Sequence, residues 1–198
     1  MATACETADF PVSCKKLLIK NKVPDDEPKN LLKVIMKDPS IALGAAGSSE
    51  DPTCSGLNGG GGALIVSSTA TGQKHATPLG PCTNWSVIGG GSGYKYKDLE
   101  NDDSTCKIVI IKQGLVKAVC KGSGPTDLDY DLTGASEAPV DVAVMTGIFD
   151  QRRYCAQLGG TITKDGTDAK KFLAKNSSAP IGCASPSGAF VDGSTLAF

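Results

Sequence analysis

The chain has 198 residues, a formal net charge of −1 at pH 7 and 40% hydrophobic residues, which suits one globular domain with a hydrophobic core. Lysine and acidic residues are interspersed and form no basic tract, so the sequence predicts no nucleic-acid partner. No apolar run reaches the roughly 18 residues that a membrane-spanning helix needs, and we expect no membrane span.

Short apolar segments, separated by Gly, Pro, Asn and Asp, follow one another along the whole chain. Such segments are typical of β-strands between turns. In chain order the predicted strands are 16–20, 31–37, 63–68, 94–96, 106–111, 115–120, 128–132, 140–145, 153–158 and 161–163, and one helical turn is predicted around 168–174. Many short strands and little helix predict a mainly β domain, a disulfide-stapled antiparallel β-sandwich or barrel.

The predicted single β domain covers residues 16–183, between an N-terminal extension, 1–15, and a C-terminal tail, 184–198. The first residues lack the basic and apolar regions of a signal peptide. We interpret them as the start of a mature exported chain with an added Met. The tail is apolar, and we expect it to pack on its own domain or to add to the sheet edge of a neighbouring molecule.

The chain contains eight widely spaced cysteines: Cys5, Cys14, Cys54, Cys82, Cys106, Cys120, Cys155 and Cys183. Zinc ligands normally occur as close pairs, which are missing here. Disulfides are therefore the better interpretation, and they imply an oxidising compartment. We expect a secreted or cell-surface protein whose cysteines are all paired, with most of the pairing left open.

One disulfide can be argued from a predicted hairpin. If Lys112-Gln113-Gly114 forms a three-residue loop with Gly114 in the left-handed conformation, the two flanking strands run antiparallel from Ile111 and Leu115. Cys106 then lies opposite Cys120 at a closely spaced position that suits a cross-strand disulfide.

The same register places Ile108 and Ile110 on the core face of the hairpin. A two-residue Gln113-Gly114 turn is the alternative. It would place Lys121 opposite Cys106 and would break the match between the apolar faces of the two strands.

Several short motifs are distributed over most of the chain: KKLLIK (15–20), KDPSI (37–41), DPT (51–53), GYKYKD (93–98), VCKG (119–122), RYC (153–155), GG (159–160) and FLAK (172–175). With these motifs the chain, from about residue 15 to residue 183, resembles a domain found, often repeated, in predicted secreted proteins of myxobacteria and related bacteria. The resemblance implies secretion and a single β domain. It implies no activity and no catalytic or binding residue.

His75 is the only histidine, so a Ser-His or Cys-His catalytic site would have to use it. It follows no G-x-S-x-G motif, and oxidised cysteines leave no thiol nucleophile. We interpret His75 as a solvated surface residue, and a secreted hydrolase is the weakest hypothesis.

Asp127, Asp129 and Asp131 alternate with apolar residues, so in a strand their carboxylates would share one face. Oxygen clusters of this kind suit calcium, the one cofactor that the sequence suggests. The calcium-loop pattern fails, however, at Leu132 and Ala138. The better interpretation is therefore a solvated strand face with the intervening apolar residues buried, namely Leu128, Tyr130 and Leu132.

Trp85, Tyr94 and Tyr96 are concentrated in one short stretch. Exposed aromatic rings pack on the apolar faces of sugars, so these residues could form a polysaccharide-binding site. Core filling is the better interpretation, because aromatic residues make up only 5% of the chain and large core residues are few.

The leading functional hypothesis is a non-enzymatic extracellular module, structural or adhesive, that assembles with itself or with other cell-surface proteins through its terminal segments. It rests on the missing catalytic constellation, the cysteines and the apolar tail. The alternative is a carbohydrate-binding module that uses the exposed aromatic residues.

Overall fold

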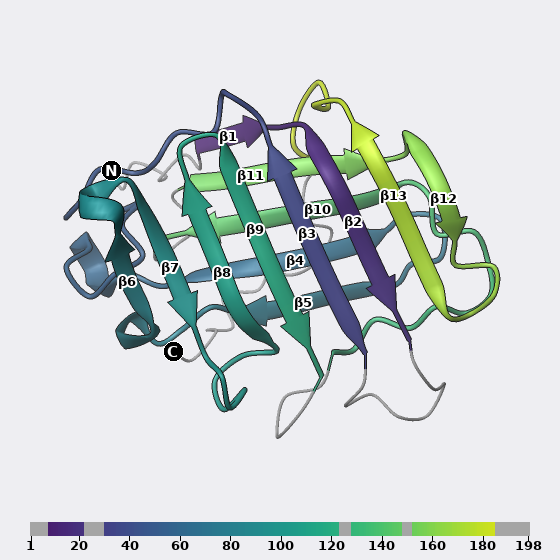
Figure 1. Ribbon diagram of the computed structural model, residues 1–198, viewed down its shortest axis with the longest axis horizontal. Coiled ribbons are helices and arrows are strands. Elements are labelled where there is room, and N and C mark those ends of the chain that lie inside the picture. Colours follow the sequence, from purple (N-terminus) through teal and green to yellow (C-terminus); the bar gives the residue numbers. More distant parts are fainter. Residues whose placement is uncertain (1–7, 22–29, 123–127, 148–151, 185–198) are drawn as a thin grey trace, which may run out of the picture.

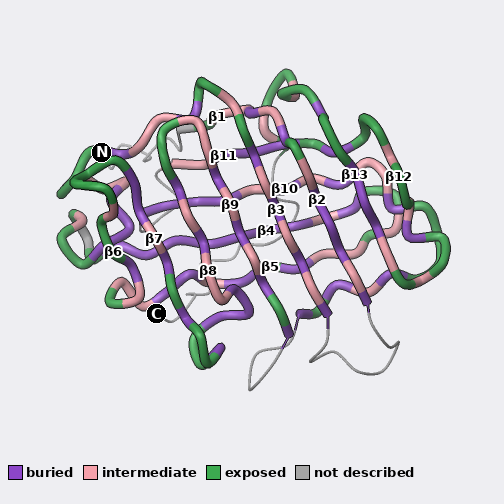
Figure 2. The backbone as a smooth tube through the Cα atoms, viewed as in Figure 1, coloured by how far each residue is buried: buried purple, intermediate pink, exposed green. Residues whose placement is uncertain are grey.

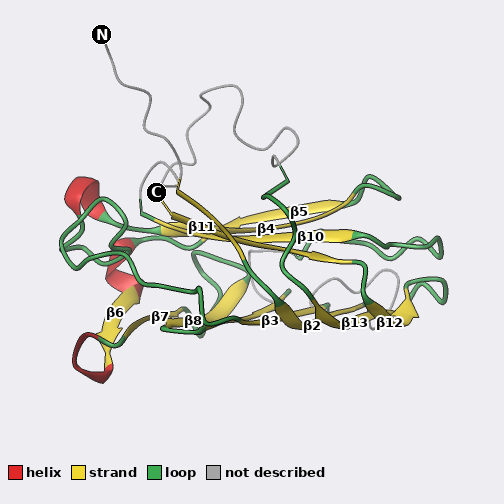
Figure 3. Ribbon diagram, turned by 90° about the horizontal axis from the view of Figure 1, so that it is seen from above, coloured by secondary structure: helices red, strands yellow, loops and turns green. Residues whose placement is uncertain are grey.

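A computed structural model describes residues 8–21, 30–122, 128–147 and 152–184. Over these residues two β-sheets pack face to face as a sandwich that does not close into a barrel (Figure 1, Figure 3), which confirms the predicted mainly β class. The described part holds no α-helix and no helix that could cross a bilayer. Short 3-10 turns lie in three connections: η2 (Leu57–Gly59), η3 (Cys82–Asn84) and η4 (Gly89–Gly91).

The larger sheet has eight antiparallel strands in the order β12-β13-β2-β3-β9-β8-β7-β6. In that order the strands are β12 (Thr161–Asp165), β13 (Lys171–Ser177), β2 (Cys14–Lys20), β3 (Leu31–Lys37), β9 (Leu115–Lys121), β8 (Cys106–Lys112), β7 (Gly93–Lys97) and β6 (Trp85–Ile88).

The smaller sheet has five strands in the order β1-β11-β10-β4-β5, and only the β1–β11 pair is parallel. These strands are β1 (Ala8–Pro11), β11 (Arg152–Leu158), β10 (Val140–Thr146), β4 (Gly62–Ser68) and β5 (Lys74–Pro78). In Figure 1 they cross behind the strands of the larger sheet rather than run alongside them.

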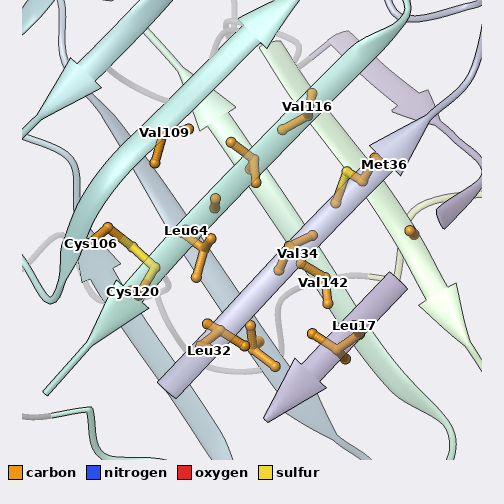
Figure 4. Close-up of a cluster of buried hydrophobic side chains, with 14 of the residues drawn as sticks. Leu17, Leu32, Val34, Met36, Leu64, Cys106, Val109, Val116, Cys120 and Val142 are labelled. Carbon is orange, nitrogen blue, oxygen red and sulfur yellow. A yellow bond between two sulfur atoms is a disulfide. The ribbon is translucent and has the colours of Figure 1, made fainter. Parts of the chain in front are cut away.

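The core fills the space between the sheets. Because side chains alternate along a strand, each strand gives every second residue to the core. On β3, Leu32, Val34 and Met36 are buried, whereas Lys33 is half-exposed, and the same alternation runs along the neighbouring strands (Figure 2). Figure 4 shows these β3 side chains meeting residues of the smaller sheet, such as Leu64.

All but one of the predicted strands are present. Residues 128–132 form no strand, and the helical turn predicted at 168–174 is wrong. The Asp168 carboxylate there accepts hydrogen bonds from the backbone N–H groups of Lys170 and Lys171, which closes a turn that leads into β13. The predicted N-terminal extension contributes β1 to the smaller sheet.

The β8–β9 hairpin has the turn that was the alternative in the sequence. Lys112 pairs with Leu115, so the turn consists of Gln113 and Gly114 alone, and Gly114 has a φ of 76°. Two-residue hairpin turns need this left-handed conformation, which glycine adopts without strain. The predicted three-residue loop is therefore wrong.

The disulfide predicted from this hairpin is nevertheless present, because β8 contains a bulge. The register shifts between Cys106 and Ile108, and this shift brings Cys106 opposite Cys120. A bulge inserts one extra residue into one strand, which makes the short turn and the cysteine pair compatible. Val109 and Ile111 face the core instead of the predicted Ile108 and Ile110.

The part of the chain that the structure describes holds three disulfides: Cys54–Cys82, Cys106–Cys120 and Cys155–Cys183. Such bonds form and persist in oxidising compartments.

The expectation that all cysteines are paired is wrong for Cys14, which is a free and buried thiol. It donates a hydrogen bond to the carbonyl oxygen of Ile35 at 3.4 Å. Burial raises the pKa of Cys14 to about 11, so the thiol is protonated at neutral pH. Cys5 lies outside the described residues.

Candidate functional site

The three aromatic residues expected to bind sugars are buried. Trp85, Tyr94 and Tyr96 expose 5%, 5% and 0% of their surface. The indole N–H of Trp85 donates to the carbonyl oxygen of Leu79 at 2.7 Å, and the Tyr96 hydroxyl donates to that of Gly80 at 3.0 Å. These rings fill a core that has few other large side chains, which agrees with the preferred interpretation of core filling and contradicts the alternative of exposed, sugar-binding rings.

The structure describes two of the three carboxylates of the acidic segment, and these two residues do not lie in a strand. The apolar residues of 128–132 are buried as expected, Asp129 is exposed, and Asp131 accepts a hydrogen bond from the Asn21 amide at 3.2 Å. Asp127 lies outside the described residues. Within the described ranges, no three His, Cys, Asp or Glu side chains are placed to hold a metal ion.

His75 is buried, not solvated as predicted. Its Nε2 atom lies 3.0 Å from the Oγ1 atom of Thr105, a distance that would suit a base beside a nucleophile. Thr105 is only 3% exposed, however, so a substrate has no access to its hydroxyl. Burial lowers the pKa of His75 to about 4, against the opposing charge of Asp129. The pair is a neutral buried contact that joins the two sheets.

A different set of side chains gathers on the outer side of the larger sheet. Four strands that are adjacent in this sheet carry the same pattern, two lysines separated by three apolar residues: Lys16–Lys20, Lys33–Lys37, Lys117–Lys121 and Lys171–Lys175. Residues at i, i+2 and i+4 of a strand point to one side. In each segment the lysines and the middle residue therefore share one face, and the other two residues share the opposite face.

Burial shows which face is which. The second and fourth residues of each segment, such as Leu17 and Ile19 on β2 or Phe172 and Ala174 on β13, are at most 1% exposed and lie in the core. The lysines consequently point away from the core, towards solvent.

Other strands of the sheet add outward lysines. We call the outward side chains of the larger sheet the lysine face. Its lysines are Lys16, Lys20, Lys33, Lys37, Lys95, Lys97, Lys112, Lys117, Lys121, Lys164, Lys171 and Lys175. They make up more than half of the 20 lysine and arginine residues of the chain.

The lysine face has no acidic residue. Asp165, at the end of β12, is the one carboxylate in the eight strands, and it accepts hydrogen bonds from Ser136 and from the backbone N–H of Ala138 instead. The ion pairs that the structure describes belong to Arg152 and Arg153 of the smaller sheet. None of the ion pairs that the structure describes therefore involves a lysine of this face. At the β12 edge, backbone hydrogen bonds and, to a smaller extent, the charge of Lys164 lower the pKa of the Asp168 carboxyl.

The strand registers arrange lysines and apolar residues as a checkerboard. Lys33 lies between Leu18 of β2 and Val119 of β9, while Lys16 lies opposite Ile35. Strand and residue spacings place lysines that are diagonal neighbours on adjacent strands roughly 8 Å apart. The apolar residues between them are half-buried or buried, as expected where lysine stems lie along an apolar surface.

Two cross-strand pairs on this face bring like charges together. Lys20 lies directly opposite Lys171, and Lys16 lies directly opposite Lys175. Like charges at such positions destabilise a sheet. Folding alone does not explain these pairs, which points to a role in binding.

The sequence analysis missed this face because it searched for a contiguous basic tract. The lysines are spread from residue 16 to residue 175, with two in each segment, and the strand order brings them together. The repeated Lys-apolar-apolar-apolar-Lys segment was the available signal, because it predicts a strand with one apolar side and one cationic side.

Comparison with protein-family models, with curated proteins and with solved structures finds no match for this chain, so the lysine face is interpreted from its geometry alone.

Proposed function

We propose that the protein is a secreted, non-enzymatic adhesion module that binds polyanionic surfaces through the lysine face. The observation that carries the proposal is a broad sheet surface with many lysines and no carboxylate. The disulfides and the resemblance of residues 15–183 to secreted bacterial domains support an extracellular location.

Binding of this kind depends on charge. Each lysine ammonium is a strongly hydrated point charge on a flexible stem. A polyanion that meets several of them releases its condensed counterions, so affinity falls linearly with the logarithm of salt concentration. The uncompensated repulsion within the face, at pairs such as Lys16 and Lys175, is relieved when anions lie over it.

The test is binding to immobilised dextran sulfate over a range of salt concentrations. We expect retention at low salt and a linear log–log loss of affinity with salt. Lys33→Gln, in the middle of the face, should reduce the salt slope by about one. The matched control is Lys74→Gln, which removes the same charge from the outer side of β5 in the smaller sheet and should leave the slope unchanged.

Absence of retention at low salt would refute the proposal. Equal losses in Lys33→Gln and Lys74→Gln would show that net charge, rather than the lysine face, causes the binding.

A further inference from the structure

The lysine face extends in two dimensions. Lysines occur on seven of its eight adjacent strands, from β12 at one edge to β7 near the other. Each of these seven strands carries one or two outward lysines. A linear polyanion lying on the sheet meets only the lysines beneath its own track. A planar anionic surface meets all of them at once, so the charge arrangement fits a plane better than a strand-like polymer.

The face lacks groups that recognise the shape of a polymer unit. The large aromatic residues of these strands, Trp85, Tyr94, Tyr96 and Phe172, all point into the core, so the outward side offers no ring on which bases or sugars can stack. Arginine is missing from all eight strands, and with it bidentate contacts to a phosphate or a base. The recognition that remains is attraction to closely spaced negative charges.

The apolar half of the checkerboard also suits a lipid surface. A surface hollow at the end of β3 and β9 is lined by Ile35, Pro39 and Leu115 and by Lys15 and Lys37. Asp38 lines it as well, and its carboxylate accepts hydrogen bonds from the Ser13 backbone N–H and from Ser40. Apolar side chains beside lysines are the composition with which proteins lie in the headgroup layer, because the stems stay in apolar surroundings while the ammonium groups contact the anions.

We propose that the polyanionic partner is a lipid leaflet rich in anionic headgroups, on which the protein lies flat with the lysine face against the phosphates. This inference rests on the proposed polyanion binding and names its partner. Each lysine near such a surface contributes a free energy equivalent to about a fivefold change in affinity.

The experiment is cosedimentation with vesicles of phosphatidylcholine, with and without phosphatidylglycerol. We expect binding only to the anionic vesicles and its loss at high salt. Lys33→Gln should weaken it about fivefold, and Lys16→Gln with Lys33→Gln and Lys117→Gln about 100-fold. Lys74→Gln is the charge-matched control and should bind like the unmodified protein.

Orientation can be measured separately. A polarity-sensitive dye is attached at Ser86→Cys, which is exposed on β6 of the lysine face, or at Ala76→Cys, which is exposed on β5 of the opposite side. Cys5 is replaced by Ser, and the buried Cys14 thiol, with its raised pKa, stays unlabelled. Anionic vesicles should shift the emission at Ser86→Cys only.

Retention on dextran sulfate without binding to anionic vesicles would overturn the leaflet as partner and leave the proposed function standing. Loss of both would overturn both. Tighter binding to duplex DNA or dextran sulfate than to anionic vesicles at equal salt would assign the face to a linear polyanion, as would an equal emission shift at the two labelled positions.

Discussion

Side chains alternate between core and solvent in the same way in both sheets. The outer sides of the two sheets nevertheless differ in charge and in how far their outward side chains are buried. On β2, β3 and β9 of the larger sheet the outward positions alternate between lysines and apolar residues, and none of them is a carboxylate. On the smaller sheet, Asp9 and Arg153 form an ion pair, and a separate apolar cluster of Ala63, Ile65 and Met145 is at most 3% exposed although it points away from the core.

The covered side is also tied to the end of the domain. The Cys155–Cys183 disulfide fixes residue 183 to β11, and Pro180 and Ala184 line a small hollow there together with Ile65. A sheet side that is covered and locally neutral serves stability, whereas an open, charged side is available to a partner. The comparison therefore supports the proposed binding by the larger sheet and assigns the covered apolar cluster to the smaller one.

The largest effect on stability is expected from removal of the Cys155–Cys183 disulfide. Replacing Cys155 and Cys183 by Ser opens a loop of 28 residues, which should reduce the free energy of unfolding by about 3–4 kcal/mol. The measurement is chemical denaturation of both proteins, with dextran sulfate binding as the second readout. Dextran sulfate binding by the folded variant should be unchanged. Weakened binding would contradict the assignment of stability and binding to different sheets.

A matched pair of isoleucines tests the difference in burial between the outer sides of the two sheets. Ile65 on β4 and Ile35 on β3 both point outward from their sheets, but Ile65 is 3% exposed and Ile35 is half-exposed. We expect Ile65→Ala to cost about 2–4 kcal/mol of unfolding free energy and Ile35→Ala less than about 1 kcal/mol. Equal losses in thermal or denaturant unfolding would contradict the contrast between a covered and an open side.

Acid should weaken the fold. Burial lowers the pKa of His75 from 6.5 to about 4, so the unfolded chain binds a proton in this interval and the folded chain does not. Stability is therefore fully present above pH 6.5 and decreases as the pH falls towards 4, by on the order of 2–3 kcal/mol.

The check is the difference in pH dependence between the unmodified protein and His75→Gln, measured by urea unfolding. An identical slope in the two proteins between pH 6.5 and pH 4 would show that His75 is not the group responsible.

The smallest effect on stability is expected at a like-charged pair. Lys16→Glu places a carboxylate opposite Lys175 and should stabilise the fold by about 0.2–1 kcal/mol while it weakens binding to dextran sulfate. Lys16→Gln separates loss of repulsion from new attraction. A loss of stability in Lys16→Glu would mean that the like-charged pair does not strain the sheet.

The sequence supports the fold better than the site. Strands such as β3 and β9 are recognisable because apolar and polar residues alternate. The pairing of Cys106 with Cys120 was predicted correctly, but from symmetry about a turn that the structure does not have. The turn length was wrong because a bulge, which has no clear sequence signal here, compensates for it.

The candidate site depends on which strands are neighbours and which sheet face is buried, and the order of residues along the chain does not give either. Tyr94 and Tyr96 share a strand face with each other, but only the packing of the second sheet shows that this face is the core. The lysines of β13 and β2 lie side by side although more than 100 residues separate them in the chain, because strand order, not sequence order, decides which charges become neighbours.

The five-residue segments, for example Lys33–Lys37, encode core and surface in alternate positions, and this determines which length changes the protein can tolerate. Inserting or deleting one residue inside such a strand would exchange its two sides, burying the ammonium groups and exposing Val34 and Met36. Folding and adhesion would then be lost together. Insertions in the turns between strands preserve the phase of the alternation, so natural or engineered length variation is expected to concentrate there.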